Sequence, residues 1–387
     1  MTRDGIGRIY GGLLLGLFVA VVSAVPVVTA LVRSDALRLE KRAPTPAPAW
    51  PKTAADWEAW PARFEAFYDD SFGLRAPLLR LNSSITTRLL GRSASDRVLK
   101  GRDGWLFFTG DHTLEFVRGE RRLGEGALAT WRAEIERRRD WLAARGIAYV
   151  FAVAPEKTSA WPEKLPRHVV RSSRPGLEQQ VRRMAGEVRL PVVDLATPLA
   201  EAKAGGIQTY YAHDTHWNLY GAAVAARALT QAVADGVGGA VAARPGPTVE
   251  IDATAAPTMR PFVGGDLATM GRIEASEATP VPTLVAAGCT ATIEAETRAS
   301  YAGVETRVRR SHCPGAPRRL AVFHDSFGEA LMSPLGSVFG EATFFWAYPT
   351  FAQFQAAVLA EKPDVVIELR VERKLLDLPD VGEPGIE

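Results

Sequence analysis

The sequence has few residues of the kinds that form covalent or metal cross-links. Its 387 residues include two cysteines and six histidines. No Cys-x-x-Cys pair or finger-like Cys/His spacing occurs, so a structural zinc site is not expected. Cys289 and Cys313 lie in one segment. This placement fits a single structural disulfide in an oxidising compartment, and it fits two buried free thiols equally well.

An excess of charge of either sign is also missing. Lys and Arg number 46 against 44 Asp and Glu, so the chain as a whole has no field that would attract nucleic acid. The glycine loop that cradles phosphates in nucleotide-binding proteins is absent too. We therefore expect no nucleic-acid partner and no cofactor. The apolar fraction of 47% is enough for a substantial core in one large domain or two ordinary ones.

One long stretch near the N-terminus has no charge at all. Residues 9–32 are uncharged, with Arg3 and Arg8 before them and Arg33 after them. A run of this length can cross a bilayer as a helix. Its first half, followed by Val22-Ser23-Ala24, also resembles a secretory signal with a small-residue cleavage site. We favour an uncleaved anchor because the apolar run continues to Arg33. Both interpretations export the rest of the chain, although the flanking charges do not decide orientation.

A spacer and an aromatic block follow. Residues 43–51 (APTPAPAWP) have the Pro/Ala-rich composition of a semi-extended linker. In residues 57–90 aromatic side chains recur at helical intervals, which indicates a packing face rather than a ligand box. These side chains are Trp57, Trp60, Phe64, Phe67 and Tyr68.

From about Gly101 onward, strand-like and helix-like runs alternate. Strands are expected at 104–108, 147–153, 191–195, 320–323, 342–348 and 364–369, and helices at 127–144, 177–188, 221–234, 328–339 and 351–361. Such alternation predicts an α/β fold with a mainly parallel sheet and helices on both faces. Residues 237–317 break the rhythm with Pro, Gly, Thr and short β-like runs. We expect them to form a β-rich insertion or a peripheral lobe.

A serine follows one of the apolar strands directly. In residues 320–328 (LAVFHDSFG) the strand runs into Asp325-Ser326, and ligands of open α/β sheets bind at the carboxyl ends of the strands. Ser326 is therefore a candidate nucleophile, with backbone N–H groups near Ser326 and Phe327 as candidate oxyanion donors. The alternative is that Ser326 or Asp325 only caps the following helix. The same tetrapeptide at 70–73 follows a helical block, so we expect Ser71 to be structural.

A serine nucleophile requires a base, and the base requires an acceptor that orients it. Residues 211–218 (YAHDTHWN) contain both, with His216 two residues after Asp214. If this turn folds back, the carboxylate fixes the imidazole tautomer. His112, His168 and His312 lie in polar contexts without a paired carboxylate in sequence, so we expect them at the surface.

Four further residues are candidates for substrate or oxyanion contacts: Phe327, Trp217, Asn218 and Lys157. Aromatic packing and surface solvation explain the last three nearly as well.

The same region permits a different chemistry. His213, Asp214, His216, His324 and Asp325 are residue types that bind a divalent metal in hydrolases. That interpretation leaves Ser326 without a role, so we expect no metal. A non-catalytic envelope protein that binds glycan is a further alternative.

Four motifs, taken together and in order, resemble those of the alginate O-acetyltransferase AlgX/AlgJ-like group, which is related to SGNH hydrolases. They are GRDGWLFF at 101–108, DTHWN at 214–218, FHDSFG at 323–328 and KPDVVIELRVER at 362–373. The resemblance covers nearly everything from about Trp57 to Arg373. It implies a triad of Asp214, His216 and Ser326 that carries an acetyl group on serine and acts on a polysaccharide. It also implies a membrane-bound O-acyltransferase partner that delivers acetyl across the inner membrane.

Some features depart from that family pattern. His324 occupies the place where SGNH hydrolases usually have Gly before the Asp-Ser pair, and their Gly and Asn oxyanion donors have no recognisable counterparts. We expect a single-pass inner-membrane protein with its catalytic domain in the periplasm. The expected organisation is a cytoplasmic tail and transmembrane anchor at 1–34, a linker at 35–56, an SGNH-hydrolase-like domain at 57–373 with the insertion at 237–317, and a tail at 374–387.

Overall fold

The computed structural model describes residues 12–20, 23, 45–72, 77–78, 81, 95–237, 248–285 and 289–379. The chain divides into two compact units. One consists of Met1–Val98 with Ala268–Glu274, and the other of Leu99–Leu267 with Ala275–Glu387. In the described ranges, no helix combines the length and the apolar character needed to cross a membrane. Most of the segment predicted as an anchor, residues 9–32, lies outside the described residues.

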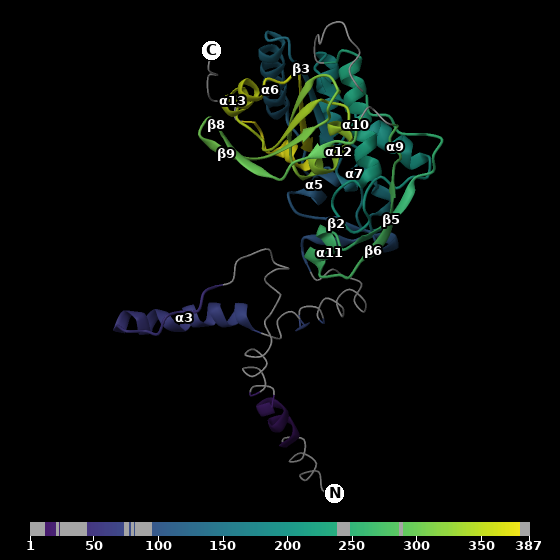
Figure 1. The fold of residues 1–387 in the computed structure, drawn as a ribbon. Coiled ribbons are helices and arrows are strands. Elements are labelled where there is room, and N and C mark those ends of the chain that lie inside the picture. The colour runs from purple at the N-terminus through teal and green to yellow at the C-terminus, as the bar shows by residue number, and fades with distance from the viewer. Residues whose placement is uncertain are drawn as a thin grey trace. The chain divides into compact units, whose positions relative to one another are not determined.

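The first unit contains one long helix, α3 (Ala54–Ser71), drawn in Figure 1. Thr53 begins it with a reciprocal capping box, in which Thr53 and Asp56 each accept a backbone N–H of the other. The aromatic side chains of the helix contact one another in a row, with centroids 4.8 Å apart for Trp60 and Phe64. Trp57 nevertheless stays 54% exposed. Ser71 is the last residue of this helix.

The second unit is built on a central sheet of eight strands (Figure 1). Their order is β4 (Val192–Val193), β3 (Ala148–Ala154), β12 (Val365–Val371), β10 (Arg319–His324), β11 (Glu341–Trp346), β9 (Val304–His312) and β7 (Thr292–Ile293), with β8 (Thr297–Tyr301) also paired to β9. Neighbours from β4 to β11 are parallel. β9, β7 and β8 are added in antiparallel orientation. The sheet is therefore mixed, and the expected parallel part is its centre.

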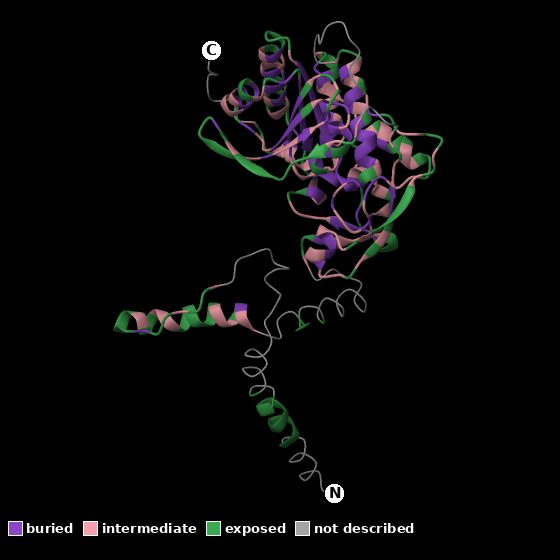
Figure 2. Ribbon diagram, viewed as in Figure 1, coloured by how far each residue is buried: buried purple, intermediate pink, exposed green. Residues whose placement is uncertain are grey.

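Helices cover both faces of this sheet. On one face, α6 (Glu125–Ala143) and α13 (Phe351–Glu361) pack on β3, where Trp131 lies 5.7 Å from Phe151 between ring centroids. On the other face lie α10 (Leu219–Ala234) and α12 (Met332–Gly336). All seven residues of β3 are buried (Figure 2). Burial on both faces explains why this strand reads as an unbroken apolar run.

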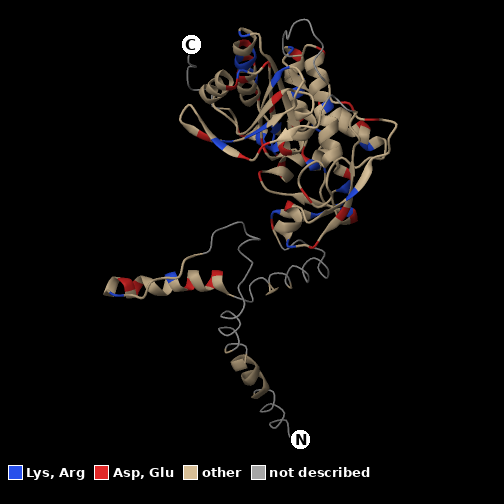
Figure 3. Cartoon of the chain, viewed as in Figure 1, with Lys and Arg blue, Asp and Glu red and all other residues tan. Residues whose placement is uncertain are grey.

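Shorter elements complete the described fold, and two of them, β1 and α11, are divided between the two units. They are β1 (Val98–Lys100), η1 (Arg102–Gly104), β2 (Leu106–Phe108), α5 (Thr113–Val117), α7 (Lys157–Ala160), η2 (Pro162–Lys164), α8 (Leu177–Glu187), α9 (Ala196–Ala204), α11 (Asp266–Gly271), η3 (Ser326–Leu331) and η4 (Glu372–Leu376). Basic and acidic residues are interspersed along the chain of the second unit (Figure 3), in keeping with the balanced composition.

The β-rich insertion predicted at 237–317 is only partly separate from the sheet. β5 (Thr258–Val263) and β6 (Ser276–Val281) form an antiparallel pair of their own. The three strands that follow them, β7 to β9, instead extend the central sheet. A disulfide bond joins Cys289, before β7, to Cys313, directly after β9.

Candidate active site

Ser326 lies at the carboxyl edge of the sheet, where β10 ends and η3 begins. Asp325 is the N-cap of η3, and its carboxylate accepts the Phe327 N–H over 2.8 Å. The other carboxylate oxygen accepts the Val371 N–H over 2.7 Å and the Tyr348 hydroxyl. Asp325 therefore takes the capping role, which leaves the Ser326 hydroxyl available for another partner.

That partner is His216. The Oγ atom of Ser326 lies 2.7 Å from Nε2 of His216. On the other side of the ring, Nδ1 lies 2.6 Å from Oδ1 of Asp214. Because a carboxylate only accepts hydrogen bonds, Nδ1 carries the proton and Nε2 is free to accept one from the serine. The structure thus brings Asp214, His216 and Ser326 into one continuous chain of hydrogen bonds.

The local fold of residues 210–218 explains how an acid and a base two positions apart can pair. Asp214 Oδ1 also accepts the backbone N–H of His216 over 3.0 Å, which closes a tight turn through the side chain. A bridge between Tyr210 and Trp217 closes the loop behind this turn. Asn218 then caps α10 by accepting the Gly221 N–H over 2.9 Å.

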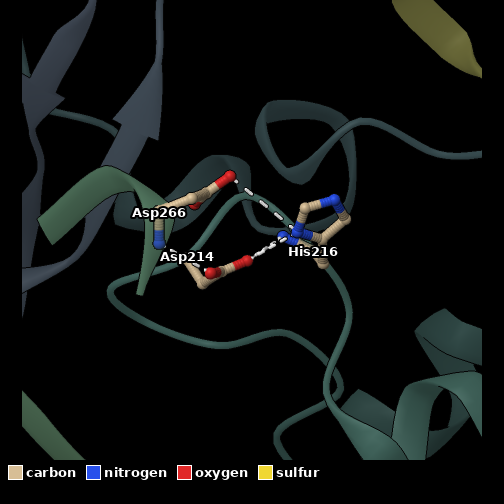
Figure 4. A group of neighbouring side chains, drawn as sticks. All are labelled: Asp214, His216 and Asp266. Atoms are coloured by element: carbon tan, nitrogen blue, oxygen red, sulfur yellow. Dashed lines mark hydrogen bonds and ion pairs between the residues drawn. The ribbon is translucent and has the colours of Figure 1, made fainter. Parts of the chain in front are cut away.

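A third acidic residue, Asp266, joins the site without any signal in the sequence spacing. Its backbone N–H donates to Asp214 Oδ2 over 2.7 Å, and its Oδ1 accepts the Thr215 N–H over 2.7 Å. Its Oδ2 lies 3.9 Å from Nδ1 of His216. Figure 4 shows both carboxylates directed toward the same ring nitrogen. In the sequence, only Gly264 and Gly265, directly before Asp266, indicate an unusual backbone at this point.

Three of the candidate contact residues are buried supports rather than parts of an open surface. Lys157 is 1% exposed, and Trp217 and Asn218 are fully buried. Trp217 donates its indole N–H to the Phe327 carbonyl over 3.0 Å. Asn218 donates to the Gln208 carbonyl over 2.7 Å. Their polar atoms are therefore used within the protein, which favours a packing role for them over direct substrate contact.

Lys157 holds the loop that contains Asp214 through hydrogen bonds to backbone carbonyl groups. Its ammonium donates to the carbonyl oxygens of Leu106, Ala212 and Asp214 over 2.6, 2.9 and 2.8 Å. Burial lowers the pKa of Lys157 to about 7, whereas the nearby charges of Asp214 and Glu277 act to raise it. Three donated hydrogen bonds require the ammonium form, because a neutral amine has only two N–H groups.

The predicted oxyanion donors differ in their availability. The Phe327 N–H is engaged by Asp325, so the expectation that it binds an oxyanion is not met in this arrangement. The Ser326 N–H, at the first position of η3, has no acceptor among the described residues. A free N–H at a helix start is suited to a developing negative charge. The ring of Phe327 instead packs on His216, with centroids 4.8 Å apart.

The electrostatics of the site favour a basic imidazole. Burial acts to raise the pKa of Asp214, but the hydrogen bond and charge of His216 and two backbone N–H groups lower it to about 2. Burial likewise acts to lower the pKa of His216, and the hydrogen bond and charge of Asp214 outweigh it, so the pKa is raised. Burial and then the charge of Asp214 raise the pKa of Asp266.

Of the residues considered for a metal site, Asp214 and His216 lie together, whereas His213 and His324 have other partners. His213 pairs with Glu277, with 3.2 Å between Nδ1 and Oε1. The Nδ1 of His324 is 2.6 Å from the Asp325 carbonyl. Within the described ranges, the group with metal-ligand character is Asp214, His216 and Asp266, whose ligand atoms lie within 4.8 Å of one another. Both oxygens of Asp214 already accept N–H hydrogen bonds, so this group is better explained as a hydrogen-bonded network.

Residues 98–299 match the family model described as an SGNH hydrolase-like domain, acetyltransferase AlgX. The probable alginate O-acetylase AlgJ of Pseudomonas fluorescens is 32% identical over 179 residues, which is 46% of this chain and 43% of that protein. The AlgJ protein of Pseudomonas syringae pv. tomato is 33% identical over 178 residues, 45% of this chain and 43% of that protein. The chain thus matches less than half the length of these relatives. The solved O-acetyltransferase domain of Pseudomonas putida AlgJ aligns with a TM-score of 0.44 and 22% identity, over 74% of this chain and 95% of that domain.

Proposed function

This chain belongs to the AlgX family of SGNH hydrolase-like acetyltransferases, and on that basis we propose that it is a serine-dependent O-acetyltransferase of an exported or cell-surface polysaccharide. The observation that carries the proposal is the hydrogen-bond chain from Asp214 through His216 to Ser326, with links of 2.6 and 2.7 Å. A positioned base with an orienting carboxylate is what activates a serine hydroxyl at neutral pH.

In the first half-reaction, Ser326 takes the acetyl group from a donor ester. His216 Nε2 accepts the hydroxyl proton while Oγ attacks the acetyl carbonyl carbon. The oxyanion of the tetrahedral intermediate is next to the Ser326 N–H. When the intermediate collapses, the bond to the leaving oxygen breaks and His216 returns the proton to that oxygen. The product is an acetyl ester on Ser326, and Asp214 stabilises the imidazolium during both steps.

In the second half-reaction, a sugar hydroxyl takes the place of the leaving group. His216 removes its proton, the sugar oxygen attacks the acetyl-serine carbonyl, and Ser326 is released with its proton restored by His216. Water in the same place would hydrolyse the ester. The same residues therefore support an acetylesterase, and the choice depends on whether a sugar excludes water from the acetyl-serine.

The location and the partners are part of this proposal. The uncharged run at residues 9–32 supports an inner-membrane anchor. The bond between Cys289 and Cys313 supports a periplasmic catalytic domain, since structural disulfides persist in oxidising compartments. A membrane-bound O-acyltransferase is the proposed source of acetyl groups. The relatives' names make alginate the first polysaccharide to test.

The decisive experiment is mass spectrometry of the protein after brief exposure to p-nitrophenyl acetate. A mass increase of one acetyl group on the peptide that contains Ser326, absent from Ser326→Ala, would support the proposal. Ser71→Ala is the matched control, because Ser71 occupies the same tetrapeptide in α3 and should not alter labelling or turnover. Parental esterase activity in Ser326→Ala would refute the serine mechanism. Loss of activity on chelation would instead point to the metal-dependent alternative.

A further inference from the structure

We propose that Asp266 is a positioning residue of this site, which holds Asp214 in place and adds a second negative charge beside the imidazolium of His216. The inference rests on the proposed function, since it assigns a role within the same Ser326 chemistry. Asp266 comes from the connection between β5 and β6, and 52 positions separate it from Asp214.

The contacts of Asp266 divide between its backbone and its side chain. The backbone N–H holds Asp214 Oδ2 over 2.7 Å, while Asp214 Oδ1 is held by His216. Asp214 therefore cannot rotate without breaking one of these bonds. The Asp266 side chain holds the Thr215 N–H through Oδ1 and places Oδ2 at 3.9 Å from His216 Nδ1 (Figure 4). At that distance Oδ2 is not a hydrogen-bond partner of the ring, but its charge acts on the imidazolium.

The backbone before Asp266 is shaped to bring it there. Gly265 has a φ of +109°, and a Cβ at this position would collide with the carbonyl oxygen of His213. Only glycine permits this close approach. From the following strand β6, Glu277 accepts the N–H groups of Ala212 and His213 over 2.9 and 3.0 Å. The connection is therefore fixed against the Asp214 loop at both of its ends.

The charges around His216 make the effect of Asp266 predictable in sign. Asp214 and Asp266 favour the imidazolium, and the guanidinium of Arg373 disfavours it. Around Asp266 itself lie Asp214, His216 and the ammonium of Lys157. Without the negative charge of Asp266, less negative charge near His216 offsets the positive charge of Arg373. The imidazolium then forms less readily, both at rest and when the proton of Ser326 is transferred.

The test is Asp266→Asn, which removes the charge but keeps an oxygen for the Thr215 N–H and the backbone N–H for Asp214. We expect the pKa of His216, followed by NMR of its imidazole, to fall by about 1 unit. The acid limb of kcat/KM for acetyl ester turnover should shift to lower pH by the same amount, with kcat lowered about tenfold. Asp252→Asn is the matched control, because the Asp252 carboxylate accepts hydrogen bonds only from the nearby Thr254 and Ala255.

Three results would overturn the inference. One is a His216 pKa unchanged by Asp266→Asn, and another is a lowered kcat without any shift of the acid limb, as expected for a merely structural residue. The third is loss of a bound divalent metal together with activity. The NMR titration of His216 can be repeated in Ser326→Ala, with and without Asp266→Asn. It then measures the effect of Asp266 on the pKa of His216 in a protein that does not turn over substrate. A failure of the proposed function would thus be seen in the Ser326 assay alone, and a failure of this inference in the titration.

Discussion

Trp217 donates its indole N–H to the carbonyl oxygen of Phe327 over 3.0 Å, and so ties the residue after His216 to the residue after Ser326. The two segments that carry the base and the nucleophile are 110 positions apart in the chain, and both residues of the tie are fully buried. The short Oγ to Nε2 distance is therefore supported by a second, parallel contact one residue further along each segment.

Trp217→Phe should weaken this tie while preserving most of the ring packing. The Phe327 carbonyl would lose a buried partner, which costs about 1–3 kcal/mol of unfolding free energy. Misplacement of the nucleophile should lower kcat by about tenfold. Trp161→Phe is a suitable control, because Trp161 also donates an indole hydrogen bond, to Thr209 at 3.2 Å, outside the triad. Equal kcat values for Trp217→Phe and the parent would show that the tie does not position the site.

The pH dependence of turnover follows from the raised pKa of His216. The base must be neutral to accept the Ser326 proton, so kcat/KM should fall on the acid side with a midpoint above pH 6.5, the ordinary imidazole value. Asp214→Asn should move that midpoint downward and reduce kcat, because it removes the main cause of the shift. A parental midpoint at or below 6.5 would contradict the prediction.

Near neutral pH, the contribution of His216 to the free energy of unfolding should fall as pH rises, whereas turnover should rise. Because the pKa of His216 is higher in the folded state, its protonation contributes stability below about pH 6.5 that is lost as pH rises through the folded pKa. Because the pKa of Asp214 is lower in the folded state, its ionised carboxylate stabilises the fold above pH 3.8. This stabilisation is lost as pH falls through about 2. Urea unfolding of the parent and His216→Gln between pH 5 and about pH 8 measures the first contribution.

Lys157→Met should destabilise the fold more than a surface lysine substitution does. Three carbonyl oxygens, of Leu106, Ala212 and Asp214, would lose their donor inside the protein. We expect a loss on the order of 3 kcal/mol in urea unfolding, with reduced turnover because the Asp214 loop loosens. Lys164→Met is the control, since the ion-pair partner of Lys164 is the exposed carboxylate of Asp103. Similar unfolding free energies for both variants would be the contrary result.

The disulfide between Cys289 and Cys313 should contribute to stability without contributing to catalysis. It closes a loop of 24 positions around β7, β8 and β9. A loop of this size corresponds to about 3 kcal/mol in the chain-entropy model. The double variant Cys289→Ser/Cys313→Ser should therefore show a lower Tm and unchanged kcat at a temperature where it is folded. A reductant that leaves the Tm of the parent unaltered would argue against this contribution.

The centre of the fold could be predicted because its signals are local. Helix α13 begins and ends where the pattern predicted, and β3, β10 and β12 follow their apolar runs closely. The helix expected at 328–339 is instead a 3-10 turn followed by the five-residue α12. Gly328 lies so close to the His324 ring that a side chain there would collide with it. A close backbone contact of this kind is not visible in the periodicity of apolar residues.

The edges of the fold and of the site depend on long-range contacts. Strands β7 and β8 are short and largely exposed, so they carry no apolar run that would assign them to the central sheet. Asp266 reaches His216 only because the β5–β6 connection folds back on the Asp214 loop, and no local pattern encodes that approach. The proposed triad could be inferred from the sequence because Asp214 and His216 share one turn and Ser326 follows a strand.

The carboxylate of Asp325 anchors the start of η3 to two neighbouring strands at once, through Val371 at the end of β12 and Tyr348 just beyond β11. The backbone before Ser326 is consequently tied to the sheet by hydrogen bonds from both sides. In the proposed reaction, both the acetyl donor and the sugar acceptor must therefore approach a hydroxyl that is held in place. If the proposal holds, the choice of acceptor should accordingly depend on the loops around Ser326 rather than on the position of its Oγ atom.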